Sequence, residues 1–150
     1  MPFAIPDDYH YVVASLSLPA LILWGQVITV GRYRRRAKID YPQMYADKAQ
    51  AEANRDAHLF NCAQRAHQNT MEGLPLIVLS TAITGLSYPL VAAGACTFWA
   101  VTRIPFTFGY LSGDPKKRGQ YGAGLGFVSN LLLSFTSAYV GWQRLWEAKF

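Results

Sequence analysis

Polar side chains that could hold a small charged ligand recur along one stretch of the chain, FNCAQRAHQNTME. Its members Asn61, Arg65, Asn69 and Glu72 are spaced by four, four and three residues. Residues three or four apart lie on one face of an α-helix, so the spacing predicts a polar stripe. Arginine binds carboxylates in a bidentate manner, whereas glutamate accepts hydrogen bonds from amino groups. The stripe therefore suits a zwitterionic peptide.

A second polar stripe is predicted on a later helix, and basic runs occur near both stripes. Arg103, Phe106 and Tyr110 are spaced by three and four residues, so they also share one helical face. The runs RYRRR, at residues 32–36, and KKR, at residues 116–118, add further cations. Several cations, an amide and one carboxylate together match the charges of glutathione, which is the predicted ligand.

The same polar residues also fit a purely structural role. Arg103 on one helix could pair with Glu72 on another and neutralise it. Polar contacts between membrane helices contribute only ~0.6 to 2 kcal/mol each. Residue spacing does not separate such an interhelical network from a ligand site, and both interpretations stay open.

The elements that must position these groups are long apolar helices. Thirty consecutive residues, Gly73 to Thr102, include no Asp, Glu, Lys or Arg. This stretch is too long for one membrane helix of about 20 residues, and Gly85, Ser87 and Pro89 interrupt its middle. The pattern predicts two helices joined by a tight turn. Residues 11–31 and 119–143 are also free of charge.

These patterns predict an all-α integral membrane protein. With about 20 residues per crossing, the predicted spans are roughly residues 11–31, 67–87, 89–111 and 120–143. The four spans account for most of the 150 residues, so a single domain over residues 1–150 is predicted.

The basic residues predict the orientation in the membrane. They concentrate between the first and second spans and between the third and fourth, whereas the turn between the second and third has none. The positive-inside rule therefore places the polar stripes at the cytosolic face. The net charge of +5 also suits binding to anionic lipid. No nucleic-acid recognition motif and no metal-site spacing of Cys or His occurs, so neither partner is predicted.

The stretch FNCAQRAHQNTME resembles the signature of the MAPEG family, the membrane-associated proteins in eicosanoid and glutathione metabolism. The runs KIDYPQMY, at residues 38–45, and GYLSGDPKKR, at residues 109–118, make the chain most similar to the type 3 microsomal glutathione transferases of that family. The resemblance implies a homotrimer of four-helix bundles. It also implies that glutathione, the co-substrate, binds between neighbouring subunits and faces the cytosol.

The resemblance assigns glutathione contacts to residues on three helices and one loop. Those contacts are Arg34, Arg65, His67, Asn69, Glu72, Tyr110 and Arg118. His67 stands where a relative has a glutamine that reaches glutathione from the adjacent subunit. For catalysis, the resemblance implies that Arg118 and Tyr110 favour the thiolate of glutathione, and that Arg35 assists the opening of a lipid epoxide.

Two residues depart from the family pattern. Phe106 stands where several relatives have tyrosine, which removes one hydroxyl contact. Gly73 replaces a larger and often aromatic residue after the glutamate. Both departures weaken the expectation of efficient leukotriene C4 synthesis.

The predicted function is that of a membrane-bound glutathione transferase and glutathione-dependent peroxidase. Its substrates would be lipophilic electrophiles and lipid hydroperoxides that enter from the bilayer, with leukotriene C4 synthesis as a further activity. The resemblance implies the endoplasmic reticulum or the outer mitochondrial membrane. Two alternatives stay open: a non-catalytic lipid-binding scaffold of the same family, and a structural membrane bundle.

Overall fold

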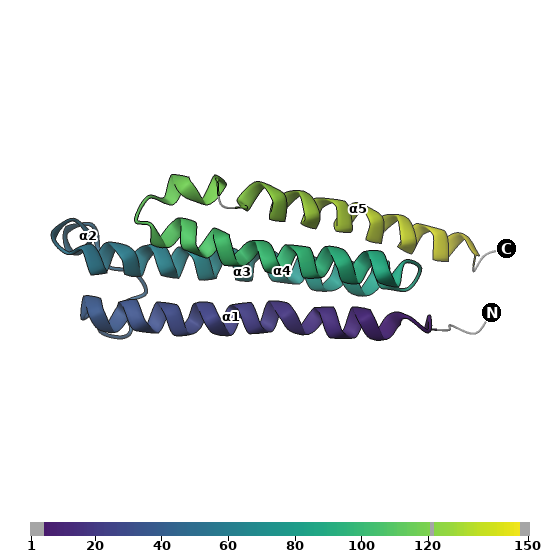
Figure 1. The fold of residues 1–150 in the computed structure, drawn as a ribbon, viewed down its shortest axis with the longest axis horizontal. Helices are drawn as coiled ribbons and strands as arrows, with labels where there is room; N and C mark the ends of the chain where they lie inside the picture. Colours follow the sequence, from purple (N-terminus) through teal and green to yellow (C-terminus); the bar gives the residue numbers. More distant parts are fainter. Residues whose placement is uncertain (1–4, 121, 148–150) are drawn as a thin grey trace. The chain divides into compact units, whose positions relative to one another are not determined.

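The computed structural model describes residues 5–120 and 122–147, and its regular elements are helices (Figure 1). No strand occurs in these two ranges. The elements are α1 (Tyr9–Ala37), α2 (Lys48–Ala53), α3 (Arg55–Gly85), α4 (Pro89–Leu111), the 3-10 helix η1 (Pro115–Gly119) and α5 (Ala123–Glu147).

Three of these helices are long and apolar enough to cross a membrane: α1, α4 and α5. The remaining long helix, α3, has 31 residues but carries Gln68, Asn69 and Glu72 near its middle. These polar side chains lower its mean hydropathy. A fourth crossing, through α3, therefore stays a prediction, as does a single domain over residues 1–150.

The predicted break between two helices is confirmed. Helix α3 ends at Gly85, and α4 begins at Pro89, whose fixed φ suits the first residue of a helix. The backbone N–H of Tyr88 donates to the carbonyl of Thr84 at 2.8 Å. This bond satisfies one of the carbonyl groups that the end of a helix leaves free.

The helices extend beyond the predicted spans on the basic side. The first span was predicted to end near Gly31, but α1 continues through the RYRRR run to Ala37. Arginine is a good helix former, so the run continues the helix. The helix ends before Lys38, whose φ of 54° is left-handed. The N–H groups of Lys38 and Ile39 donate to the carbonyls of Arg35 and Arg34, each at 3.2 Å, which forms a Schellman motif.

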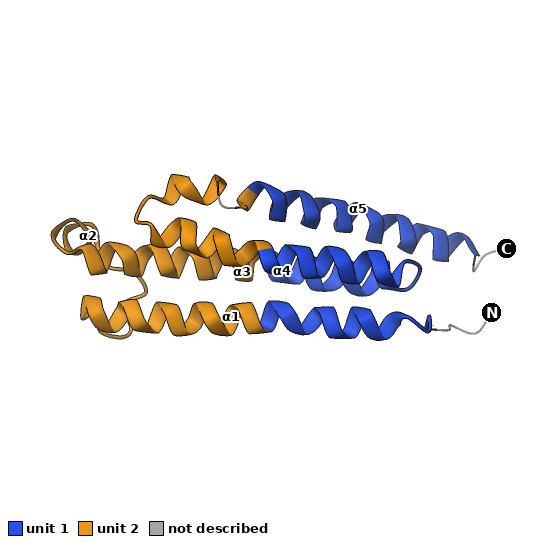
Figure 2. Cartoon of the chain, viewed as in Figure 1, with its two compact units in different colours: residues 1–20, 73–101, 124–150 blue, residues 21–72, 102–123 orange. Residues whose placement is uncertain are grey.

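The described chain divides into two compact units (Figure 2). Unit 1 contains residues 1–20, 73–101 and 124–150, and unit 2 contains residues 21–72 and 102–123. Helices α1, α3 and α4 each contribute residues to both units. The polar stripes of α3 and α4, including Arg103, belong to unit 2.

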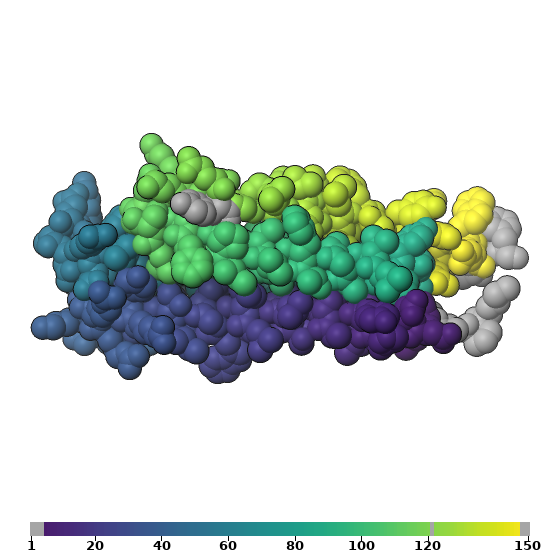
Figure 3. Space-filling model, viewed as in Figure 1, coloured from purple at the N-terminus to yellow at the C-terminus, as the bar shows by residue number. Residues whose placement is uncertain are grey.

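In unit 2, an apolar cluster fixes the segment that connects α1 to α3. Its buried members are Ala37, Ile39, Ala46, Ala57 and Phe60. The space-filling view shows the connecting segment, in blue and teal, packed against the end of α1 (Figure 3). This packing removes apolar surface from water and holds the connecting segment to the helices on either side of it.

Three helices of unit 2 are also joined by a buried polar node. The side-chain N–H₂ of Gln26 on α1 donates to the hydroxyl of Thr70 on α3 at 2.9 Å and to that of Thr107 on α4 at 2.8 Å. Each such bond contributes about 0.6 kcal/mol between membrane helices. Interhelical hydrogen bonding of the kind that the structural alternative requires is therefore present at Gln26.

In unit 1, the structure explains why a small residue follows Glu72. A Cβ atom on Gly73 would lie 3.3 Å from Cζ2 of Trp99 and 3.6 Å from Nδ2 of Asn130. Trp99 is 2% exposed and is among the largest buried side chains. Its indole ring fills the space beside Gly73, so a large residue at position 73 would collide with it.

Candidate functional site

An ion pair between two members of the predicted stripe lies at the centre of the candidate site. Nη1 of Arg65 lies 2.8 Å from Oε1 of Glu72, within α3. The two side chains are 46% and 56% exposed, respectively. A pair that is so open to solvent contributes little to stability, about 0 to 1 kcal/mol. Both charged groups are accessible, so a ligand could replace each partner with its own charge.

Asn69, on the same face of α3, is held by an arginine of α4. Nη1 of Arg103 donates to Oδ1 of Asn69 at 3.3 Å, and Arg103 is only 5% exposed. The structural alternative expected Arg103 to neutralise Glu72, but the carboxylate of Glu72 forms its ion pair with Arg65. The reason is helical geometry, because Arg65 and Glu72 lie two turns apart on one face.

Phe106, which lacks the hydroxyl group of the family pattern, has a packing role. The guanidinium carbon of Arg103 lies 4.4 Å from the centre of the Phe106 ring. The same ring meets Tyr110 edge-to-face, with ring centres 5.2 Å apart. Cation–π and edge-to-face contacts are both favourable, so Phe106 fixes two neighbouring residues of the site.

Tyr110 and Arg118 were predicted to act together, and the structure brings them together. Nη1 of Arg118 donates to the Tyr110 hydroxyl at 2.8 Å. Tyr110 is 2% exposed near the end of α4, whereas Arg118 is exposed on η1. A Cβ atom on Gly109 would lie 2.9 Å from Cα of Arg118. Only glycine therefore allows η1 to lie this close to α4.

One residue that the sequence did not assign to the site is Tyr45, in the segment between α1 and α2. Its hydroxyl group donates to Oε1 of Gln68 on α3. Burial raises the pKa of Tyr45, and the nearby cation of Arg65 opposes part of this shift. The phenol therefore remains a protonated hydrogen-bond donor at neutral pH. The run KIDYPQMY had indicated a family subtype, but nothing in its spacing indicated a contact with α3.

Arg34 was predicted to bind glutathione; it lies in the last turn of α1, and its side chain contacts the connecting segment. It is 7% exposed, and its Nη1 donates to the carbonyl of Gln43 at 2.7 Å. Its guanidinium carbon lies 4.2 Å from the centre of the Tyr41 ring and 4.6 Å from that of Phe60. Two aromatic faces and a backbone carbonyl compete with any ligand for this cation.

The side chains of Arg35 and His67 do not join the other candidate residues at the site. Arg35 is exposed in the last turn of α1, and no described residue forms an ion pair or side-chain hydrogen bond with it. His67 lies on α3 roughly 200° around the helix axis from Arg65, at 3.6 residues per turn. Its Nδ1 is buried and has no hydrogen-bond partner among the described residues.

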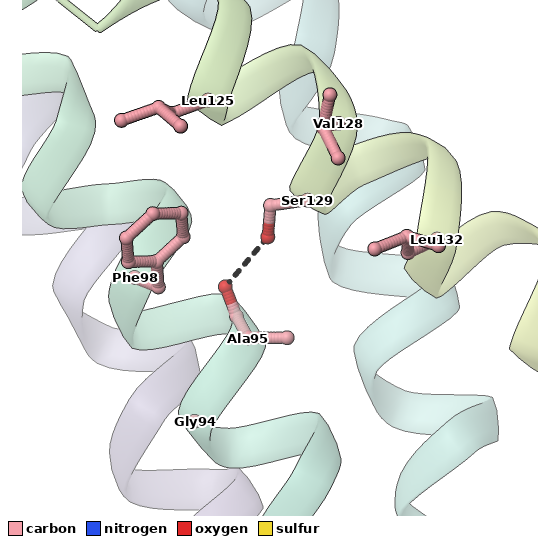
Figure 4. A pocket seen from close by; sticks show the side chains of 7 residues that line it. All are labelled: Gly94, Ala95, Phe98, Leu125, Val128, Ser129 and Leu132. Carbon is pink, nitrogen blue, oxygen red and sulfur yellow. Dashed lines mark hydrogen bonds between the residues drawn. The ribbon is translucent and has the colours of Figure 1, made fainter.

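Unit 1 has an apolar pocket of about 370 Å³ between α4 and α5. Figure 4 shows Phe98 of α4 facing the cavity, with Leu125, Val128 and Leu132 on α5. The hydroxyl of Ser129 donates to the carbonyl of Ala95 at 3.1 Å. None of the lining residues carries an ionisable side chain, so this pocket offers no charged group to a thiol.

A comparison with protein-family models matches residues 11–139 to the MAPEG family. The match covers most of the chain and includes every residue of the Arg65–Glu72 and Tyr110–Arg118 pairs. The three apolar helices agree with a membrane-embedded protein. The chain therefore belongs to the MAPEG family, which includes glutathione transferases and related enzymes.

Proposed function

We propose that this protein is a membrane-bound glutathione transferase and glutathione-dependent peroxidase, of the kind represented by the type 3 microsomal enzymes. The observation that carries the proposal is the solvent-accessible Arg65–Glu72 pair, in the same compact unit as the Tyr110–Arg118 pair. The first pair supplies ligand-binding charges, and the second supplies a cation with a hydroxyl group for a thiolate.

Glutathione binding would replace the internal ion pair of α3 with two intermolecular ones. The guanidinium of Arg65 takes a carboxylate of the ligand, and the carboxylate of Glu72 takes its ammonium group. The side-chain amide of Asn69 pairs with a peptide group of the ligand. Because the internal pair is half-exposed, breaking it costs little, about 0 to 1 kcal/mol.

The Tyr110–Arg118 pair would stabilise the thiolate of bound glutathione. The Tyr110 hydroxyl accepts a hydrogen bond from Arg118, which leaves its own proton to donate to sulfur. A cation near a thiol favours the charged form and therefore lowers its pKa. The thiolate is the nucleophilic form, so a lower pKa increases its fraction at neutral pH.

Two reactions follow from a bound thiolate and a lipophilic partner. Attack on an epoxide carbon forms a C–S bond, and the ring oxygen leaves as an alkoxide that takes up a proton. Attack on the terminal oxygen of a lipid hydroperoxide breaks the O–O bond, giving an alcohol after protonation and a sulfenic acid on glutathione. A second glutathione then forms the disulfide and releases water. Holding both reactants together supplies part of the rate enhancement.

The assembly that we propose is a homotrimer in the endoplasmic reticulum or outer mitochondrial membrane, with the site facing the cytosol. Helix α3 would be the fourth membrane crossing. A ligand between subunits would allow Arg35 and His67 to reach it from a neighbouring chain. For the side chain of Arg34, on α1, we propose a role in holding the connecting segment, because its guanidinium contacts two aromatic rings and the Gln43 carbonyl.

The decisive experiment is calorimetric titration of the detergent-solubilised full chain with glutathione. Saturable binding, together with turnover of a lipid hydroperoxide or a leukotriene epoxide, supports the enzyme. A chain that binds glutathione but turns over neither class of substrate contradicts the proposed activity. Absence of glutathione binding favours the scaffold or the structural bundle.

A further inference from the structure

The segment between α1 and α2 is fixed at two points by side chains from the neighbouring helices. Nη1 of Arg34 donates to the carbonyl of Gln43 at 2.7 Å. Asn61 binds both backbone groups of Ala46: its Oδ1 accepts from the N–H at 2.8 Å, and its Nδ2 donates to the carbonyl at 2.9 Å. The asparagine thus replaces the hydrogen bonds that a paired backbone would make.

Tyr45 lies between these two fixed points and beside the candidate site. Its hydroxyl group donates to Oε1 of Gln68, and the phenol also interacts with the side chain of Arg65. The charge of Glu72 and the hydroxyl of Tyr110 are close enough to influence it electrostatically. All five residues belong to unit 2.

If the proposed function holds, on which this inference rests, the geometry points to Tyr45 as a further glutathione-binding residue. Its hydroxyl group donates to the same ligand carboxylate that Arg65 binds. Asn61 is then a positioning residue, because it holds the backbone of the next residue, Ala46. Without ligand, the amide oxygen of Gln68 accepts the hydrogen bond of Tyr45.

A ligand carboxylate would displace Gln68 as the acceptor for a physical reason. Hydrogen bonds to an ionised acceptor are roughly twice as strong as those between neutral groups. The segment itself does not depend on the Tyr45 hydroxyl, because Arg34 and Asn61 hold its backbone on either side. Removal of this hydroxyl should therefore change ligand binding without loosening the fold.

The test is calorimetric titration of the full-length Tyr45→Phe variant with glutathione in detergent. The expected result is an affinity about tenfold lower than that of the unmodified chain, the loss typical of one hydrogen bond to a charged group. The matched control is Tyr41→Phe, in the same segment. Tyr41 is 80% exposed, and phenylalanine retains its ring contact with Arg34, so the affinity should not change.

The outcomes separate this inference from the proposed function. If the unmodified chain binds glutathione and Tyr45→Phe binds it within twofold, Tyr45 is not a ligand and the inference fails alone. If the unmodified chain does not bind glutathione, the proposed function fails, and the inference fails with it. An equal loss for Tyr41→Phe would also overturn the inference, because the effect would belong to the whole segment.

A double-mutant cycle tests the positioning role of Asn61. Asn61→Ala should weaken glutathione binding when Tyr45 is present, but should have little further effect in the Tyr45→Phe background. Asn61→Asp keeps the acceptor for the Ala46 N–H and should have a smaller effect. It replaces the alanine variant in the cycle if that variant does not fold. Equal losses in both backgrounds would show that Asn61 acts independently of Tyr45.

Discussion

At the scale of single residues, solvent exposure decides whether the Arg65–Glu72 pair serves the fold or a ligand. Removing one partner of a buried pair would strongly destabilise the fold, because an unpaired charge would remain inside the protein. Here both side chains are about half exposed, so water can solvate the partner that remains. Substitution at this pair should therefore affect ligand binding more than stability.

Arg65→Ala should reduce glutathione affinity at least about 100-fold, because a ligand carboxylate loses its charged partner. The free energy of unfolding of the ligand-free chain should change by less than about 1 kcal/mol. Calorimetry and thermal unfolding measure the two effects. Arg32→Ala, at another exposed arginine, is the control and should leave both unchanged. A clear loss of stability with unchanged affinity would instead support the structural alternative.

Arg118→Ala should reduce turnover more than binding. In the proposed mechanism the cation stabilises the thiolate and lowers the pKa of the bound thiol, so its removal should raise that pKa. Activity at neutral pH should then fall and should recover as the pH rises toward the new pKa. The ultraviolet absorption of the thiolate, followed by pH titration of the complex, measures this shift. An unchanged pKa would show that another group stabilises the sulfur.

Helical periodicity explains which residue contacts could be predicted. Arg65 and Glu72 share a face because both lie on one helix, and spacing alone predicts that. The burial of Arg34 depends on two aromatic rings from other parts of the chain, Tyr41 and Phe60. The contact between Tyr45 and Gln68 likewise depends on how the connecting segment folds. Neither long-range contact leaves a periodic signal in the sequence.

At the scale of elements, close backbone approach between α4 and η1 positions the cation of Arg118 beside Tyr110. Gly109→Ala would place a Cβ atom 2.9 Å from the backbone of Arg118, which cannot move aside as a flexible side chain can. We expect η1 to shift, the Tyr110–Arg118 bond to weaken, and the pKa of bound glutathione to rise as in Arg118→Ala.

The control for Gly109→Ala is Gly25→Ala, in α1. No atom lies within 4 Å of a Cβ atom at position 25, so the added methyl meets open space. Alanine is the better helix former by about 0.8 to 1 kcal/mol, so this variant should be slightly more stable with an unchanged thiol pKa. Equal effects of the two substitutions would contradict the role of Gly109.

The end of α1 gives a prediction about stability. Lys38 adopts the left-handed conformation, with φ 54°, which costs roughly 1 to 2 kcal/mol for a residue with a side chain. Lys38→Gly should therefore stabilise the chain by about 0.5 to 1 kcal/mol, measured by thermal unfolding. Lys38→Ala retains the strained conformation and should give no such gain. A glycine variant no more stable than the alanine variant would count against this explanation.

A helix or turn could be predicted where the length of an apolar run determines it. The turn between α3 and α4 follows from a charge-free run that is too long for one helix. The length of a membrane span does not, however, determine where its helix ends. Helix α2 begins with a capping box formed by Asp47 and Gln50, and α3 begins at Arg55, ahead of the apolar run. Local capping sets these boundaries rather than hydrophobicity.

At the scale of the whole molecule, the single chain leaves many large apolar side chains uncovered. Trp24, Phe127 and Phe135 are each about two-thirds exposed, on helices long enough to cross a membrane. Lipid tails or neighbouring chains must cover such surfaces.

The orientation of His67, away from Arg65 on α3, bears on whether one chain can form the whole site. If both residues contact one ligand, they must come from different chains.

Co-expression of two variants tests whether the site spans subunits. Arg65→Ala and His67→Ala should each reduce glutathione-dependent turnover when expressed alone. In a mixed cyclic oligomer, about a quarter of the interfaces would combine an intact Arg65 from one chain with an intact His67 from its neighbour. Turnover should therefore rise above that of either variant alone. If mixing gives only the average of the two, each site lies within one chain, and His67 has no role at the ligand of its neighbour.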